Sequence, residues 1–318
     1  MALLRKRAAM FSAIRFFFAE RGVLEIETPS LCNAVGTDPN LDFFDSRLRL
    51  PGSHVQNPMY LQTSPEFSMK RLLAAGSGSI YQICKAFRNG EVGRYHNPEF
   101  TILEWYRVGF SLYDLIDEID VLLQQILGDS LSSKLTDHLS YTSVFSRFCG
   151  LDPIQADISA FVDCAVRNDF SEAIEICAGR RTLWQEFLFS HLVQPNLGMV
   201  GLTFVDRYPA SQAALARLCP DNPQLVDRFE VFYQGVELAN GFYELRDVEE
   251  QERRFDQELQ QRKLERKFVP AKDDRFLSAL KAGLPECVGV AVGLDRILML
   301  ATGVDSIEDV LPFSISRA

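Results

Sequence analysis

Apolar residues near the N-terminus recur with the spacing of an α-helix. Steps of four, three, three and four residues separate the apolar positions Leu4, Ala8, Phe11, Ile14 and Phe18. This spacing places them on one continuous helix face, and Gly22 stands where such a helix would end. The segment is rich in arginine, as a transit peptide would be, but its unbroken apolar face favours a structural helix.

The pattern of apolar and polar positions also predicts the remaining elements. Strands are predicted over 23–31, 41–50, 59–62, 79–88, 100–109, 226–238 and 286–292. Helices are predicted over 65–75, 112–127, 247–267 and 293–302. Because strands and helices are interspersed without a regular βαβ alternation, we expect an α+β fold with a mainly antiparallel sheet. Residues 128–225 contain no recognisable motif, and a single domain over 1–318 is the simplest expectation.

The predicted helix 247–267 is densely charged. Glutamate and arginine are spaced four residues apart in Glu249–Arg253, Glu250–Arg254 and Glu258–Arg262. Such pairs stabilise the exposed surface of a helix, so we expect this charged surface to face solvent rather than a binding partner.

The charge balance and the cysteines narrow the class of protein. The chain has 33 lysines and arginines against 43 aspartates and glutamates, a net charge of -10. Proteins that grip long stretches of nucleic acid are usually basic, so we expect no extensive nucleic-acid binding. Seven cysteines form no C-x-x-C pair, and the four histidines lie far apart, so no zinc spacing is present. Reduced thiols are typical of a cytoplasmic protein, and no apolar stretch approaches the ~20 residues of a membrane span.

The segment IYQICKAFRNGEVGRYHNPEFTILEWYRVGF combines aromatic, charged and apolar positions in two predicted strands. With a two-residue period, one face of the second strand carries Phe100, Ile102, Glu104 and Tyr106, while the opposite face is almost wholly apolar. Arg88 stands at the mouth of the intervening loop, where its guanidinium could bind a phosphate through two nitrogens. The alternative is an ordinary hairpin with a half-exposed polar face.

Two carboxylates mark the segment GVELANGFYELRD. Glu237 and Glu244 stand seven positions apart, which in a regular strand places them on opposite faces. Asn240 and Gly241 between them can supply a turn or bulge that resets the register. Both carboxylates would then face one cavity, as a Mg²⁺ or ammonium site requires. The alternative is a pair of surface glutamates.

The segment GVAVGLDRILML predicts a strand of small residues followed by a helix. Gly293 at the turn lets a ligand approach the backbone closely. Arg296 lies near the start of the helix, where the backbone favours polyphosphate. On its own this string is a weak signal.

Taken in this order, the strings resemble the class II aminoacyl-tRNA synthetases of the lysyl subgroup across nearly the whole chain. VLEIETPSL resembles their motif 1, FRNGEVGRYHNPEF their motif 2 and GVAVGLDRILML their motif 3. ELANGFYEL matches the lysyl-type ELxNGFxEL segment, and TSPEFSMKRLL matches the amino-acid-binding loop and helix. The resemblance implies the class II catalytic fold and a homodimer whose interface includes the motif 1 helix and Pro29.

The resemblance also implies a site for ATP and Mg²⁺. Its nucleotide-binding residues would be Arg88, Asn89, Gly90, Glu91, Asn97, Phe100, Glu237, Leu238, Gly293 and Arg296. Arg88 and Arg296 would be the catalytic residues: Arg88 would hold the α-phosphate, and Arg296 would stack adenine against Phe100. Glu237, together with Glu244, would hold Mg²⁺. The family's motif 2 usually has Arg-Asn-Glu, whereas Gly90 occupies the third position here, so either Glu91 takes the glutamate's role or adenine recognition rests on backbone and stacking.

For the amino acid, the resemblance implies the binding residues Ser64, Pro65, Glu66, Tyr106, Glu244 and Ala291. Glu66 would receive the amino group near the carboxylate, and Glu244 with Tyr106 would receive the distal ammonium. A diamine needs carboxylates at both ends because an unpaired buried charge costs several kcal/mol.

Motif 1 begins at about residue 20, so we expect the chain to lack the anticodon-binding OB domain of a lysyl-tRNA synthetase. A stand-alone core with GRYHNPEFTILEWYR resembles the elongation factor P β-lysine ligases, which activate (R)-β-lysine as an adenylate and transfer it to a lysine of elongation factor P. Ala291 fits this family: the synthetases tend to have Gly there, and an added methyl would favour a substrate whose amino group has moved to the β-carbon. The alternatives are a lysyl-tRNA synthetase-like enzyme acting on tRNA or another amine acceptor, and a catalytically impaired regulatory paralogue.

Overall fold

A nine-stranded sheet forms the centre of the computed structural model, which describes residues 1–52 and 56–318. The strands run in the order β1-β5-β6-β12-β11-β10-β8-β7, and β9 pairs with β10. Their bounds are β1 (Leu24–Glu25), β5 (Ile80–Phe87), β6 (Glu99–Val108), β12 (Cys287–Gly293), β11 (Val236–Tyr243), β10 (Asn222–Tyr233), β9 (Leu218–Cys219), β8 (Leu202–Pro209) and β7 (Thr136–Ser140). Parallel pairing is confined to β1–β5 and β7–β8 at the two ends of the sheet. The expected α+β fold with a mainly antiparallel sheet is confirmed.

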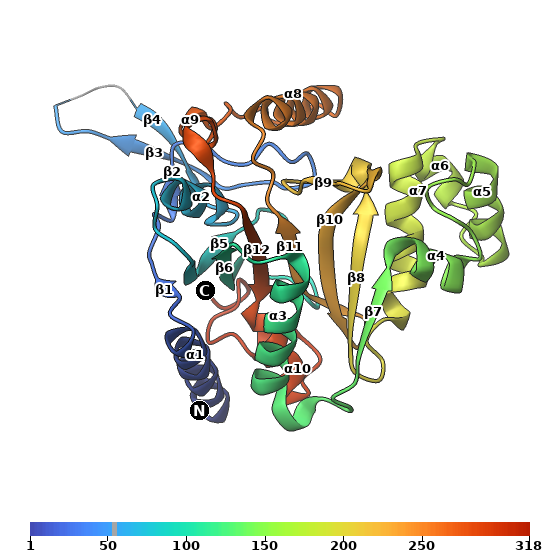
Figure 1. Ribbon diagram of the computed structural model, residues 1–318, viewed down its shortest axis with the longest axis horizontal. Helices are drawn as coiled ribbons and strands as arrows, with labels where there is room; N and C mark the ends of the chain where they lie inside the picture. The colour runs from blue at the N-terminus through green and yellow to red at the C-terminus, as the bar shows by residue number, and fades with distance from the viewer. Residues whose placement is uncertain (53–55) are drawn as a thin grey trace.

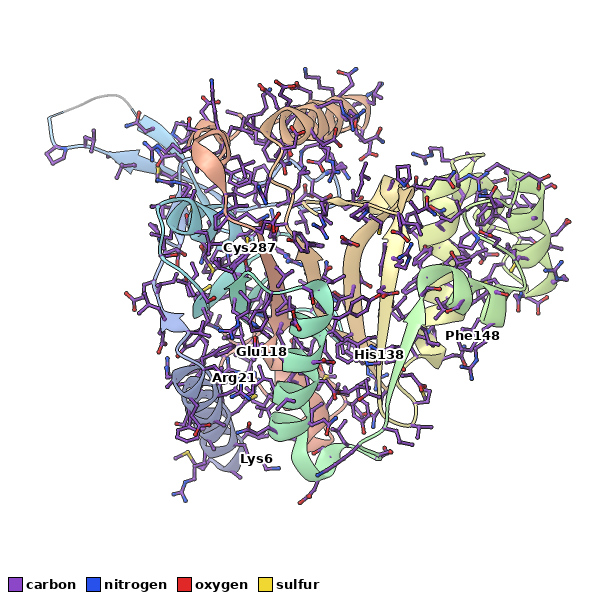
Figure 2. The ribbon with its side chains drawn as sticks, in the orientation of Figure 1. Lys6, Arg21, Glu118, His138, Phe148 and Cys287 are labelled. Atoms are coloured by element: carbon purple, nitrogen blue, oxygen red, sulfur yellow. The ribbon has the colours of Figure 1, made fainter. Side chains whose placement is uncertain are left out.

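Three helices cover one face of the sheet, and Figure 1 shows them gathered beside one another. They are α1 (Ala2–Glu20), α3 (Leu112–Leu127) and α10 (Leu294–Thr302). Their apolar sides pack with Leu103 and Trp105 of β6 in the main hydrophobic core. At the end of α1, Arg21 Nε lies 3.8 Å from Glu118 Oε1 of α3, and both residues are labelled in Figure 2. The predicted first helix is therefore an integral part of the core.

The opposite face is covered toward one end by a second group of elements (Figure 1). These are α2 (Glu66–Ala74), α8 (Val248–Leu264), α9 (Asp274–Gly283) and a three-stranded sheet of β2 (Leu31–Cys32), β4 (Gln56–Leu61) and β3 (Asp45–Arg49). Phe255 of α8 and Phe276 of α9 pack with Tyr106 of β6 in a small apolar cluster. This packing holds α2 and α8 around the polar face of β6.

Residues 141–188, within the stretch that showed no motif, form a helical lobe at the far end of the sheet (Figure 1). Its helices are α4 (Tyr141–Cys149), α5 (Ile158–Arg167), α6 (Ala173–Cys177) and α7 (Arg181–Leu188), followed by a π-helical turn at Phe189–Val193. Short 3₁₀ turns lie at Gly128–Ser130, Gln194–Asn196, Ala210–Gln212 and Ile307–Asp309. The lobe has its own apolar core, to which β8 contributes Val205 while the adjacent Phe204 enters the main core. Within the described ranges, no helix combines the length and apolarity needed to cross a bilayer.

Two of the predicted strands are each divided in the structure. The prediction over 23–31 becomes β1 and β2, because β1 pairs with β5 of the large sheet whereas β2 pairs with β4 of the small one. The prediction over 226–238 becomes parts of β10 and β11, joined by a tight turn at Gln234 and Gly235, which have φ angles of 51° and 73°. In both cases the apolar pattern continues across a change of direction, so periodicity alone missed the break.

The prediction that the charged surface of α8 faces solvent is wrong for one stripe of the helix. Arg254 and Arg262 are buried, and Arg262 donates to the carbonyl oxygens of Asp38 (2.6 Å) and Leu41 (3.0 Å). Glu258 on the same stripe accepts a hydrogen bond from a threonine of the same loop, residues 33–44. Arg262 thus binds backbone carbonyls of this irregular loop, and Arg254 donates to those of Ala214 and Ala216, so both arginines satisfy carbonyls outside α8.

Candidate active site

Two adjoining cavities lie over the polar face of the central strands. The larger, here the acidic cavity, has a volume of about 290 Å³ and includes Glu66, Glu104 and Glu244 in its lining. The smaller, here the arginine cavity, has a volume of about 220 Å³ and includes Glu237 and Arg296. Both linings contain Arg88, Ile102, Asn240 and Ala291. These four residues therefore mark where the contents of the two cavities would meet.

The strand register explains this arrangement. Ala291 of β12 pairs with Glu104 of β6 on one side and with Asn240 of β11 on the other. Their side chains consequently stand in a row on one face of the sheet. The predicted polar face of β6 is confirmed, since Ile102, Glu104 and Tyr106 line the acidic cavity while Leu103 and Trp105 are in the core.

A buried ammonium lies between two carboxylates of the acidic cavity. Lys70 Nζ is 2.6 Å from Glu66 Oε1 and 2.5 Å from Glu244 Oε2. The side chains of Lys70 and Glu244 are each only 1% exposed. Lys70 stands one helical turn after Glu66 on α2, which brings their side chains together, and Glu244 follows directly on β11. One cation thus fixes both carboxylates predicted to receive the two ammonium groups of a diamine.

Glu104 supplies a third carboxylate at the floor of the same cavity. Tyr106 donates its hydroxyl proton to Glu104 Oε1 at 2.7 Å, and Ser64 donates to Oε2 at 2.8 Å. The Ser64 oxygen in turn accepts the backbone N–H of Glu66 at 3.0 Å. This chain of hydrogen bonds ties the floor of the cavity to the first turn of α2.

Burial shifts the protonation of these groups. Burial, then the charge of Glu66, raises the pKa of Glu104 to about 7. Burial also raises the pKa of Glu244 to about 8, against the opposing charge of Lys70. Burial tends to lower the pKa of Lys70, but the charges of Glu244 and Glu66 outweigh it and raise that pKa above its usual range. The lysine therefore stays an ammonium while the carboxyls titrate near neutrality.

The arginine cavity holds its charges differently. Arg296, in the first turn of α10, donates to the carbonyl oxygens of Glu237 (2.9 Å) and Tyr95 (3.2 Å). Its Nη1 also lies 3.5 Å from Glu237 Oε2, and its Nη2 lies 2.8 Å from His96 Nε2. Burial, then the charge of Arg296, lowers the pKa of His96, which keeps the imidazole neutral and able to accept this contact.

Arg88 stands between the two cavities. It donates from Nε to the carbonyl oxygen of Thr63 at 3.4 Å, and its guanidinium carbon lies 5.1 Å from the centre of the Phe100 ring. The stacking of adenine between Phe100 and Arg296 stays a prediction, and the guanidinium that lies over the Phe100 ring in this structure is that of Arg88. Glu91 Oε1 lies 3.8 Å from Arg88 Nη1.

The structure does not place Glu237 and Glu244 around one metal ion, which corrects that part of the prediction. A bulge does reset the register, but it lies at Leu238, where Val231 pairs with Ala239 and Phe232 with Glu237. Seven residues of strand still separate the two carboxylates by roughly 20 Å. Metal–oxygen distances are only about 2 Å, so Glu237 alone remains at the arginine cavity.

Of the other predicted residues, some line a cavity and some do not. Gly293, the residue before α10, lines the arginine cavity, as do Asn97 and Leu238. Both polar groups of the Asn97 side chain already hold the backbone, through Glu99 O (2.6 Å) and Ile315 N (3.0 Å). The described residues that line either cavity do not include Pro65, Asn89, Gly90 or Glu91.

Several residues of the site were absent from the predicted set, among them Lys70, Glu104 and Asn240. Glu104 had a signal, because the strand period placed it on the predicted polar face. Lys70 had a weaker one in its four-residue spacing from Glu66. Asn240 was considered only as part of a turn or bulge, but it lies in regular pairing within β11, opposite Ala291.

Comparisons with known proteins agree with this geometry. The family model for tRNA synthetases class II (D, K and N) matches residues 1–317. The chain is 48% identical over 319 residues to the elongation factor P–(R)-beta-lysine ligase of Sodalis glossinidius (strain morsitans), with 100% of this chain and 96% of the relative covered. It is 47% and 46% identical to the proteins of the same name from Enterobacter sp. (strain 638) and Salmonella arizonae, over 99% of this chain and 95% of each relative. The chain therefore belongs to the class II tRNA synthetase family (D, K and N), together with the elongation factor P–(R)-beta-lysine ligases that it resembles over its full length.

Proposed function

We propose that the chain uses ATP to activate (R)-β-lysine as an adenylate and then attaches it to a lysine of elongation factor P. The names of its relatives support the ligase activity and its acceptor. The adenylate and the assignment of residues to each substrate rest on the geometry of the two cavities.

The charge balance of the acidic cavity is the observation that carries the proposal. Glu66 and Glu244 both pair with the ammonium of Lys70, and Glu104 lines the same cavity. With all four groups ionised, the site has an excess of two negative charges, which a substrate with two ammonium groups would neutralise. An amino acid with a neutral side chain would leave one buried carboxylate uncompensated, at a cost of several kcal/mol.

The junction of the cavities is where the chemistry would occur. The substrate carboxylate attacks the α-phosphorus of ATP, the bond to the bridging oxygen breaks, and pyrophosphate leaves. Arg88 faces both cavities and would stabilise the charge that develops at phosphorus. Mg²⁺ would accompany ATP and neutralise pyrophosphate, and the half-exposed carboxylate of Glu237 fits an ion that keeps several waters and few protein ligands.

Transfer completes the reaction. The ε-amine of the acceptor lysine, once it has lost its proton, attacks the carbonyl carbon of the adenylate, and AMP leaves as the new amide forms. Ala291 supports the choice of the β-amino acid, because its methyl group stands in the sheet row between Asn240 and Glu104. It would occupy space that an α-amino group needs. The expected homodimer, with α1 and Pro29 in its interface, remains part of the proposal, and sedimentation would test it.

The proposal is tested by ATP–pyrophosphate exchange with α-lysine and (R)-β-lysine, followed by mass analysis of purified elongation factor P. We expect exchange to favour (R)-β-lysine and the acceptor to gain the mass of one β-lysyl group. Efficient aminoacylation of tRNA, with no change in elongation factor P, would favour the synthetase-like alternative. An absence of exchange with either amino acid would favour a regulatory paralogue.

A further inference from the structure

A cation from the first helix is bound behind the arginine cavity. Arg7 of α1 places Nη1 2.5 Å from Asp295 Oδ1 and donates from Nη2 to Thr101 Oγ1 at 2.5 Å. Asp295 also accepts the backbone N–H of Thr101 through its other oxygen, at 2.6 Å. The three residues come from α1, β6 and α10, so the cluster joins segments that are distant in sequence.

Two members of this cluster, Thr101 and Asp295, are adjacent in sequence to residues of the arginine cavity. Thr101 directly follows Phe100 on β6, and Asp295 directly precedes Arg296 in the first turn of α10. Thr101 and Asp295 themselves belong to the cavity wall. The ladder between β6 and β12 ends at Ile102 and Gly293, so the N–H of Thr101 lies beyond it and bonds to Asp295 instead.

Asp295 needs a cation to hold this arrangement. Its side chain is 2% exposed, and a buried carboxylate is costly unless it is paired and hydrogen-bonded. The start of α10 supplies part of the compensation through the helix dipole. The guanidinium of Arg7 supplies a full charge and, through its second nitrogen, also reaches Thr101, so it sets the spacing between β6 and α10.

We propose that Arg7 is a positioning residue for the nucleotide: it keeps Phe100 on β6 and Arg296 on α10 at the separation that ATP requires. This inference rests on the proposed use of ATP. Arg7 acts through Asp295 and Thr101, and therefore its loss weakens binding of ATP rather than binding of the amino acid. The acidic cavity has its own fixed network through Lys70, which does not involve α1.

A purely structural role for Arg7 predicts something different. A brace that only holds α1 in the core would lower the free energy of unfolding and the fraction of active protein, while each active molecule kept its affinity for ATP. The KM values for the two substrates, measured after titration of active sites by stoichiometric pyrophosphate release, separate these two roles.

The experiment compares Arg7→Met, Arg7→Lys and two control variants in pyrophosphate exchange. We expect Arg7→Met to raise KM for ATP about tenfold and to leave KM for the amino acid unchanged, because a charge-assisted bond to a buried carboxylate is lost. Arg7→Lys retains the charge but offers one nitrogen in place of the guanidinium fork, so we expect a rise of about threefold. The controls are Lys6→Met, at the adjacent exposed residue labelled in Figure 2, and Arg15→Met, whose ion pair with Glu25 is half exposed, and both should match the parent.

An unchanged KM for ATP in Arg7→Met, or equal changes in both KM values, would overturn the proposal. If Arg7→Met does not fold, Arg7→Lys decides, and a parental KM for ATP in that variant overturns the proposal as well. Calorimetry with a non-hydrolysable ATP analogue separates this inference from the proposed function. Parent protein that binds the analogue but shows no exchange would refute adenylate formation, while weaker binding by Arg7→Met would still support the positioning role.

Discussion

The acidic and arginine cavities share four residues but differ in how far their charged side chains are buried and in what those side chains bind. In the acidic cavity, Lys70 and Glu244 are each 1% exposed and bind one another directly. In the arginine cavity, the side chains of Arg296 and Glu237 are 21% and 36% exposed, and Arg296 is held mainly by backbone carbonyls. A neutral carbonyl is a weak partner for a guanidinium compared with a phosphate. The first cavity is therefore preset for ammonium groups, whereas the second keeps a cation available for a polyanion.

This difference predicts which property each cavity controls. Charges in the acidic cavity are deeply desolvated, so their effects depend on pH and on the exact fit of the amino acid. Charges in the arginine cavity are partly solvated, so their effects are exerted through phosphate binding and weaken with salt. Variants in one cavity should accordingly change the KM for one substrate and spare the other.

Loss of Arg88 should have the largest effect, because this side chain serves both cavities. We expect Arg88→Ala to slow adenylate formation, because the variant loses about 2–4 kcal/mol of transition-state stabilisation. Arg296→Ala, which removes a cation from one cavity only, should cost at least about tenfold and should fall mainly on ATP. Pyrophosphate exchange measures both effects, and circular dichroism confirms that the variants are folded. A parental exchange rate in either variant would refute its assigned role.

A matched pair of carboxamide variants tests the separation of the cavities. We expect Glu244→Gln to raise KM for the amino acid, because the loss of a charge-assisted bond to an ammonium weakens binding by about 1.5–3 kcal/mol. Glu237→Gln should leave KM for the amino acid unchanged and should alter how the rate of pyrophosphate exchange depends on the concentrations of ATP and Mg²⁺. If both variants changed the same KM by the same factor, the two cavities would not serve separate substrates.

Ala291→Gly tests selectivity at the junction. One methyl group in a packed pocket is worth about 1–3 kcal/mol, or roughly 10–200-fold in discrimination. We expect the parent to have a higher kcat/KM for (R)-β-lysine than for α-lysine, and the variant to gain α-lysine use while retaining most β-lysine use. A variant that gains nothing on α-lysine would contradict the steric explanation.

The pH dependence should give the smallest effect and the clearest contrast. Glu104 and Glu244, with pKa values of about 7 and about 8, are largely protonated at pH 6 and largely ionised at pH 8.5. Because the ionised forms bind ammonium groups, KM for the amino acid should fall about tenfold over this range. KM for ATP should change less, since burial and the charge of Arg296 lower the pKa of His96 and favour its neutral form. Parallel pH profiles for the two substrates would contradict the comparison.

The sequence predicted individual elements better than it predicted how their ends connect. The alternation along β6 correctly separated the face of Glu104 and Tyr106 from that of Trp105, because strand geometry is local. The stripe of α8 that carries Arg254 and Arg262 was misassigned, because its partners lie elsewhere in the chain: those of Arg254 are about 40 residues away and those of Arg262 more than 200. Spacing along a helix identifies a stripe but not what that stripe contacts.

The site shows the same limit. Arg88, Glu66 and Arg296 could be predicted because sequence motifs place them at the ends of strands or helices, where the local backbone fixes the position of the side chain. Lys70 could not, because nothing local distinguishes a lysine that pairs with solvent from one that pairs with Glu244, more than 170 residues later. Asn240 was considered as part of a turn or bulge because Asn-Gly pairs favour such irregularities, but pairing with β12 on one side and β10 on the other keeps it in a strand.

The sequence by itself determined the order of elements, the polar face of β6 and a set of candidate residues for binding phosphate and ammonium groups, because these depend on short-range periodicity and on side-chain chemistry. Only the tertiary structure decided that Glu237 and Glu244 line different cavities, that Lys70 links two carboxylates, and that Arg7 pairs with Asp295 at the wall of the arginine cavity. The physical reason is that ionic contacts and pKa values depend on distance and burial in space. Both are set when β6, β11, β12, α1 and α2 come together in the folded chain.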